Sequence, residues 1–113
     1  MLLALSAVLA CGPAPDGYHT RGLVKAREGS GADLRVAIHH ERIADFKDRD
    51  GKRAPMPSMS MLFGLASALE ATPLVVGDKL AFDFEVRWTG SPTLLITRLQ
   101  KLPADTELKL TEH

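Results

Sequence analysis

The sequence contains a single cysteine, Cys11, and no excess of charge of either sign. One thiol cannot form an intramolecular disulfide, nor supply a cysteine-based zinc site or a dithiol redox centre within one chain. Lys+Arg and Asp+Glu both count 14, so no overall field attracts nucleic acid or anionic lipid. Familiar catalytic patterns are also missing: we find no nucleophile beside a recognisable base, no glycine-rich phosphate loop and no well-spaced carboxylate pair. A non-enzymatic role is therefore expected.

Long apolar runs are also scarce. The run at residues 1–10 is too short to span a bilayer, which needs roughly 20 residues, and it suits the hydrophobic region of a secretory signal. Cys11 follows Val8-Leu9-Ala10 and precedes a glycine, which resembles the lipobox of bacterial lipoproteins. That resemblance implies a signal peptide at 1–11 with Cys11 as the lipid attachment site; the alternative is a free thiol in an ordinary signal. Residues 12–17 are expected to form a flexible tether.

From Tyr18 onward the hydrophobic pattern mostly has a period of two, which is typical of half-buried strands. The expected strands cover residues 18–28, 34–40, 59–63, 79–88 and 92–102, with one or two helical turns at 65–71. Five short strands joined by turns predict an all-β fold, a small closed or nearly closed OB-like barrel. This barrel is expected to occupy residues 18–104, followed by a polar C-terminal tail at 105–113.

The charged segment Asp45 to Pro55 is expected to be a solvated loop with a turn at Asp50-Gly51. Its carboxylates suggest a calcium loop, but the spacing does not fit one. With Gly51 at the sixth loop position, Phe46 and Pro57 would stand at the first and twelfth, where an EF-hand needs side-chain oxygens.

Three of the four methionines lie within six residues, at Met56, Met59 and Met61. Thioether sulfur is a soft donor that selects Cu(I), and by the same softness Ag(I), over zinc, magnesium or calcium. Met59 and Met61 are two residues apart, so on a strand both point the same way. Methionine more often simply fills core gaps, but here small Ser58 and Ser60 alternate with the methionines, where a core strand would usually carry β-branched residues.

His40 is the candidate nitrogen donor. Alternation places it on the same face as Ile38, at the strand end where a barrel opens to solvent, whereas His39 points the opposite way. The only tryptophan, Trp88, is expected on an inward face at another strand end, where it packs in the core or at the rim.

The segments IHHExI at 38–43, MSMxF at 59–63 and GDKLAFxF at 77–84 together resemble the CusF-like periplasmic copper- and silver-binding proteins. The resemblance covers roughly residues 22–102. It implies a five-stranded OB-like barrel that binds one Cu(I) or Ag(I) with one histidine and two methionines, which correspond to His40, Met59 and Met61.

The resemblance also implies a tryptophan that caps the metal through a cation–π contact, three residues before the first ligand methionine. Met56 stands there instead, and it either adds a third thioether or leaves the site more open. Trp88 can approach the site from another wall as a substitute cap. The segment at 44–55 is also longer than in the family pattern. Its expected role is that of a flap over the site or of a loop that contacts a partner.

The resemblance implies a periplasmic metallochaperone, and the lipobox-like sequence adds a lipid anchor as its only expected link to the membrane. Its expected partner is a component of a metal efflux complex or a copper enzyme during maturation. One alternative is an OB-type module that binds a protein or oligonucleotide without metal, although one Trp, one Tyr and four Phe offer few stacking surfaces. Another is an enzyme accessory domain holding zinc or copper(II) through histidines, which strand alternation disfavours.

Overall fold

The computed structural model describes residues 16–90 and 92–111 of the chain. The expected signal peptide with Cys11, and most of the tether at 12–17, lie outside this part. Its regular elements are the strands β1 (Asp16–Glu28), β2 (Arg35–His40), β3 (Met59–Leu65), β4 (Lys79–Val86) and β5 (Leu94–Lys101), and the 3₁₀ helices η1 (Gly31–Asp33) and η2 (Ser67–Leu69). Neither of these two helices has the length and apolar character needed to cross a membrane.

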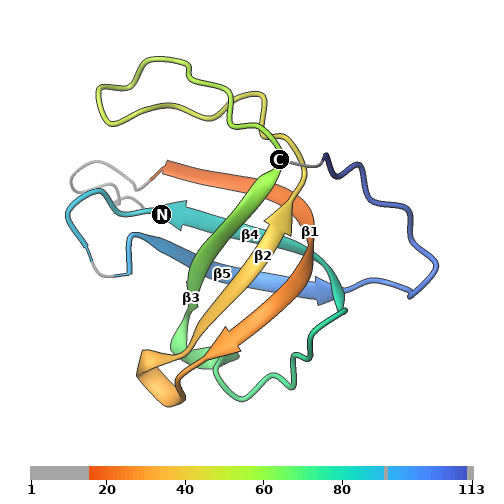
Figure 1. Ribbon diagram of the computed structural model, residues 1–113. Helices are drawn as coiled ribbons and strands as arrows, with labels where there is room; N and C mark the ends of the chain where they lie inside the picture. The colour runs from red at the N-terminus through yellow and green to blue at the C-terminus, as the bar shows by residue number, and fades with distance from the viewer. Residues whose placement is uncertain (1–15, 91, 112–113) are drawn as a thin grey trace, which may run out of the picture.

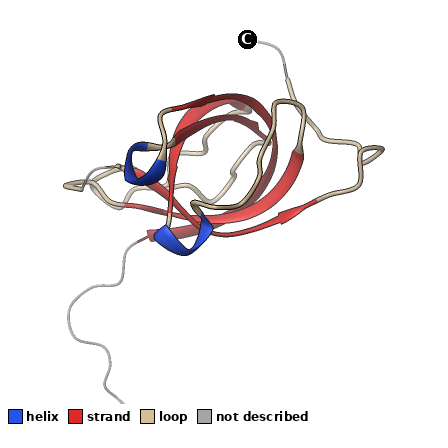
Figure 2. Cartoon of the chain, turned by 90° about the horizontal axis from the view of Figure 1, so that it is seen from below, coloured by secondary structure: helices blue, strands red, loops and turns tan. Residues whose placement is uncertain are grey.

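The strands close into a barrel in the order β1-β2-β3-β5-β4, with β4 pairing back onto β1. All neighbouring pairs are antiparallel except β3 and β5, which are parallel. Figure 1 shows β2 and β3 crossing in front of β4 and β5, and Figure 2 shows the strands curving around a common interior. The expected all-β, OB-like barrel is confirmed.

Alternation along the strands explains the core. In β4 every second residue is buried, which turns Phe82 and Phe84 inward and leaves the residues between them partly exposed. Both rings contact Phe63 of β3 edge-on, with centroids 5.2 Å apart in each pair. Burying a side chain of this size contributes roughly 1.5–3 kcal/mol, so these three rings are a major part of what holds the two walls of the barrel together.

Several element boundaries differ from the sequence-based prediction. Strand β4 ends at Val86, and the amide of Gly90 bonds the carbonyl of Arg87 at 2.9 Å, so Trp88 lies in a turn rather than on an inward strand face. The backbone hydrogen bond within this tight turn ends the strand, although the apolar alternation of the sequence continues as far as Trp88. Strand β1 already includes the last two residues of the expected tether, and the expected helical turns shrink to η2.

Residues 41–58 form a hairpin-like arm beyond the end of the barrel (Figure 1). At its base Ile43 and Met56 exchange two backbone hydrogen bonds of 2.9 Å. At its tip the Asp48 carboxylate accepts the amides of Asp50 and Lys52 at 2.9 and 3.0 Å. The expected turn is confirmed by Gly51, whose φ of 82° suits glycine. The arm is therefore more ordered than a plain solvated loop.

The segment after β5 folds back along the barrel. Lys79 Nζ donates to the carbonyls of Ala104 and Thr106 at 2.7 and 2.6 Å. Farther along, the amide of Thr111 donates to Ser58 Oγ at 3.1 Å. Residues 102–111, which we call the C-terminal strap, thus run back to the beginning of β3 (Figure 1).

Candidate metal centre

The register of β2 and β3 brings the predicted ligands together. His40 pairs with Met59 and Ile38 pairs with Met61. Paired residues of an antiparallel ladder project to the same face, and diagonal neighbours remain within reach of long side chains. His40, Met59 and Met61 therefore share the inner face at the end of this strand pair, as predicted from alternation.

His40 is more deeply buried than expected. The sequence placed it where the barrel opens to solvent, but the structure gives it an exposed fraction of 0%. The arm explains the difference, because its base at Ile43 and Met56 covers this end of the barrel, and Ile43 is itself buried. Met59 and Met61 are only partly buried, so the open side of the candidate centre is the methionine side.

The hydrogen bonding of His40 defines its tautomer. Nδ1 lies 2.7 Å from the carbonyl oxygen of Glu41, which can only accept, so Nδ1 carries the proton. Nε2 is then an unprotonated acceptor, and it is buried with no hydrogen-bond partner among the described residues. Leaving a buried polar atom unsatisfied costs about 1–3 kcal/mol. A free lone pair of this kind is what a metal ion requires from histidine.

Burial also changes the protonation of His40. Desolvation lowers the pKa of its imidazole below the ordinary value, the hydrogen bond to the Glu41 carbonyl opposes this shift, and nearby His39 adds slightly to it. A lowered pKa keeps the ring neutral near pH 7, which is the form that binds metal.

The donor set suits a soft monovalent ion. It combines one neutral imidazole with two uncharged thioethers, and sulfur-rich sets of this type favour Cu(I) over hard or borderline divalent ions. The described residues contain no group of three or more His, Cys, Asp or Glu side chains placed to hold a metal.

His39 points away from this site, as alternation predicts. Its Nε2 lies 3.0 Å from Oγ of buried Ser58, the residue just before Met59. The two adjacent histidines therefore have different partners on opposite faces of β2, and they do not converge on one ion. This arrangement does not support the zinc or copper(II) alternative.

Met56, Met61 and Trp88 all line an apolar groove of ≈440 Å³. Trp88 is 36% exposed and its ring contacts Phe46 of the arm, with centroids 6.4 Å apart. Trp88 therefore packs at the rim, which was one of the two expected places. Met61 belongs to both the ligand pair and the groove, so the groove adjoins the methionine side of the centre.

Sequence reasoning missed the groups that support His40. Glu41 Oε1 and Oε2 accept Nε and Nη2 of Arg21 at 2.9 and 2.8 Å, and Oε2 also accepts the amide of Lys109 at 2.7 Å. The pKa of the Glu41 carboxyl is lowered, mainly by the hydrogen bond from Arg21. The only available signal was an acidic residue directly after the ligand, because its partners are distant in sequence.

Gly22 is a second missed residue. It pairs with His40 across β1 and β2, and a Cβ added there would lie 2.8 Å from the carbonyl oxygen of His39 and 3.1 Å from Cα of His40. The absence of a side chain therefore allows β1 to approach β2 closely behind the ligand.

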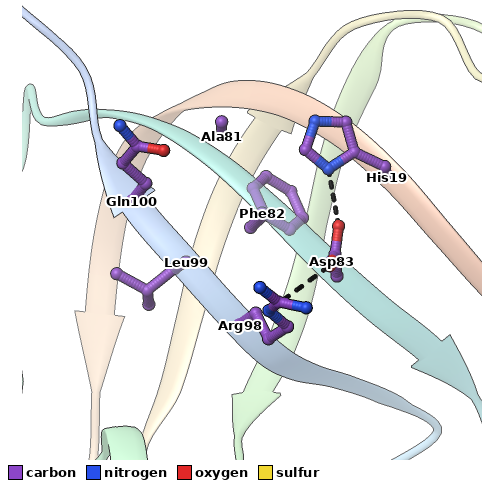
Figure 3. A pocket seen from close by; sticks show the side chains of 7 residues that line it. All are labelled: His19, Ala81, Phe82, Asp83, Arg98, Leu99 and Gln100. Carbon is purple, nitrogen blue, oxygen red and sulfur yellow. Dashed lines mark hydrogen bonds and ion pairs between the residues drawn. The ribbon is translucent and has the colours of Figure 1, made fainter.

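Another hollow, of ≈170 Å³, lies between residues of β1, β4 and β5 (Figure 3). In it His19 and Arg98 both point toward Asp83, with Nδ1–Oδ1 and Nε–Oδ2 distances of 2.5 and 3.9 Å. His19 and Arg98 are solvent-exposed, and such surface pairs contribute about 0–1 kcal/mol. This cluster is a paired polar surface, and it holds neither thioether nor buried free nitrogen.

No family model matches the sequence, and no curated protein sequence matches it. Solved structures do match. CusF from Escherichia coli with Ag(I) is 22% identical, with a TM-score of 0.57, over 79% of this chain and 95% of that chain. Apo-CusF from the same organism is 21% identical, with a TM-score of 0.58, over 86% and 100%. Another Ag(I)CusF crystal structure is 20% identical, with a TM-score of 0.50, over 78% and 100%. The chain therefore has a CusF-like fold.

Proposed function

We propose that this chain binds one Cu(I) or Ag(I) through His40, Met59 and Met61 and passes it to a partner protein. The observation that carries the proposal is the buried, unpartnered Nε2 of His40, on the same face as two methionines of the neighbouring strand. A soft ion relieves the cost of that unsatisfied nitrogen, and the thioethers complete its coordination. The Ag(I) named for the structurally similar CusF supports this choice of ion.

The open methionine side suits a carrier rather than a permanent store. His40 is fully buried, whereas Met59 and Met61 are partly exposed, so an incoming partner ligand meets the sulfurs first. Met56 and Trp88 line the adjoining groove. In this proposal Met56 shields the ion or adds a third thioether, and Trp88, which lines the same groove, acts as a substitute cap. No catalytic step is involved.

The proposed setting is the periplasm, with the chain held at the membrane by lipid on Cys11. The recipient of the metal is then a component of a metal efflux complex or a copper enzyme during maturation. Support for this setting comes from the lipobox-like sequence and the CusF-like fold.

Anaerobic titration of the protein with Cu(I) against a competing chelator tests the proposal. We expect one Cu(I) per chain, bound far more tightly than Zn(II), because the site has one nitrogen and soft sulfur donors. Zinc binding of equal or greater strength at the same residues would refute it. Absence of tight Cu(I) binding would instead favour an OB-type interaction module.

Met56→Trp tests the role of the residue at the expected capping position. A tryptophan there should slow Cu(I) transfer to the chelator and leave the affinity largely intact, because it adds a cover without removing His40, Met59 or Met61. Transfer rates measured by stopped flow provide the readout. Complete loss of binding would show that Met56 is an essential thioether ligand.

A further inference from the structure

Every polar group of Glu41 makes a hydrogen bond, and one of them, the backbone carbonyl, bonds the candidate ligand His40. Its carbonyl oxygen accepts Nδ1 of His40 at 2.7 Å, and its amide donates to the carbonyl of Arg21 at 2.9 Å. Its carboxylate accepts a bidentate pair of hydrogen bonds from the guanidinium of Arg21 and one more from the amide of Lys109. We call Arg21, Glu41 and the main chain of Lys109 the Glu41 network.

This network fixes the direction of the Glu41 carbonyl. A peptide group immediately after a strand end can rotate unless something holds the residue. Here the carboxylate is held at both oxygens, with charge-assisted hydrogen bonds on each. Rotation of the residue would strain these bonds, and Thr20 Oγ1 also donates to the same carbonyl oxygen at 3.4 Å. The carbonyl therefore stays aimed at Nδ1 of His40, and the ring keeps its proton on Nδ1.

The C-terminal strap makes a second contact at the same end of the barrel. The amide of Thr111 donates to Oγ of Ser58, which also bonds Nε2 of His39. Ser58 precedes Met59, just as Glu41 follows His40. The strap therefore holds the two residues that flank the candidate ligands, one on each strand of the β2–β3 pair.

We infer that Glu41 is a positioning residue for the metal centre, and that together with Arg21 and the C-terminal strap it presents the free Nε2 of His40 toward Met59 and Met61. The inference rests on the proposed function, because it assigns these contacts to metal binding. It adds residues distant in sequence to the site. Loss of an outer hydrogen-bonding partner of a metal-binding histidine typically costs 10–100-fold in affinity.

Glu41→Ala tests the inference through affinity. We expect Cu(I) binding to weaken by about tenfold, the lower end of that range, because the carbonyl remains but loses the restraint that the carboxylate provides. Glu28→Ala is the matched control, since it removes the same charge from an exposed residue. Glu28 pairs with Arg35 at the start of β2, away from His40 at its end, so this change should leave affinity unchanged. Equal affinities of Glu41→Ala and the wild type would overturn the inference.

A double-mutant cycle separates positioning from general stabilisation. If Glu41 acts through His40, Glu41→Ala should cause no further loss of affinity when His40→Ala is already present. If Glu41 only supports the fold, Glu41→Ala should cause the same tenfold loss of affinity with His40 present and with His40→Ala. This additivity would overturn the inference.

The third test changes only a backbone donor. Lys109→Pro removes the amide that bonds the Glu41 carboxylate, whereas Lys109→Ala keeps it. We expect weaker Cu(I) binding in the proline variant alone, with circular dichroism confirming that both variants fold. This pair also keeps the inference testable if Glu41→Ala does not fold. Equal affinities of the two Lys109 variants would show that the strap takes no part in positioning.

Imidazole nitrogen NMR of the metal-free protein provides a readout that does not depend on metal binding. The wild type should show His40 protonated only on Nδ1, and Glu41→Ala should show a mixture of tautomers. Unchanged tautomers in Glu41→Ala would overturn the inference. If the wild type binds no Cu(I), the proposed function fails, and the tautomer comparison still decides whether Glu41 orients His40.

Discussion

His40 and His39 are adjacent, chemically identical side chains, and replacing each in turn with alanine separates metal binding from stability. His40→Ala removes the one nitrogen donor, so Cu(I) affinity should fall by at least ~10-fold, or about 1.4 kcal/mol. His39→Ala should leave the affinity largely unchanged, because the ring lies on the opposite face of β2 and bonds Ser58 Oγ at 3.0 Å.

The stability of the two metal-free variants follows from the same contacts. His39→Ala loses one partly buried hydrogen bond, which is worth about 1 kcal/mol. His40→Ala loses the bond to the Glu41 carbonyl, also about 1 kcal/mol, and opens a cavity at a fully buried position. It also removes the unsatisfied Nε2, which relieves about 1–3 kcal/mol. A cavity of this kind costs about 2–5 kcal/mol, so the losses outweigh the gain. Both variants should fold, with His40→Ala less stable than His39→Ala by about 1–3 kcal/mol.

Urea unfolding measures the free energy of unfolding of each metal-free variant, and anaerobic chelator competition measures its affinity. The expected pattern is a larger loss of stability in His40→Ala than in His39→Ala, with a loss of affinity only in His40→Ala. Equal losses of affinity would mean that β2 does not alternate as a regular strand at the two histidines. A greater loss in His39→Ala would mean that the assigned register, and with it the ligand set, is wrong.

Three further predictions concern pH, packing and export. Burial lowers the pKa of His40, so between its folded and unfolded pKa values the folded state binds fewer protons and stability rises with pH. Cu(I) affinity should accordingly decline only below ~6.5, and affinity that stays constant at every acidic pH at which the protein remains folded would count against His40 as a ligand. Gly22→Ala should destabilise the barrel by about 1–3 kcal/mol, because its Cβ would lie 2.8 Å from the carbonyl oxygen of His39; unchanged urea unfolding would contradict this. Radiolabelled fatty acid should label the exported wild type but not Cys11→Ser, and label on that variant would exclude Cys11 as the anchor.

Strand positions and the ligand face could be predicted because both depend on local alternation. His40 and Ile38 share a face whatever the rest of the chain does, and the same is true of Met59 and Met61. The depth of His40 could not be predicted, since it depends on how the arm closes over the barrel end. Trp88 was placed on a strand because apolar alternation continues past the point where turn hydrogen bonds end β4.

The supporting contacts were beyond sequence reasoning for a different reason. Arg21 and Glu41 are 20 residues apart, and Lys109 is 68 residues from Glu41. Charged residues are common on any surface, so nothing in the composition marks these as partners. Only the barrel topology, which pairs β1 with β2 and returns the strap to that end, brings them together.

The placement of all three candidate ligands on one strand pair has a consequence for folding. Joining His40 to Met59 closes a loop of modest length, whereas closing the barrel pairs β1 with β4, for example Asp16 with Val86, which lie much farther apart in the chain. The entropic cost of closure grows with loop length, so the donor atoms can meet before the barrel is complete. If the proposed function holds, an ion held by the β2–β3 pair alone would also bind partly folded chains. Metal should therefore raise the unfolding midpoint by less than its affinity for the native protein implies.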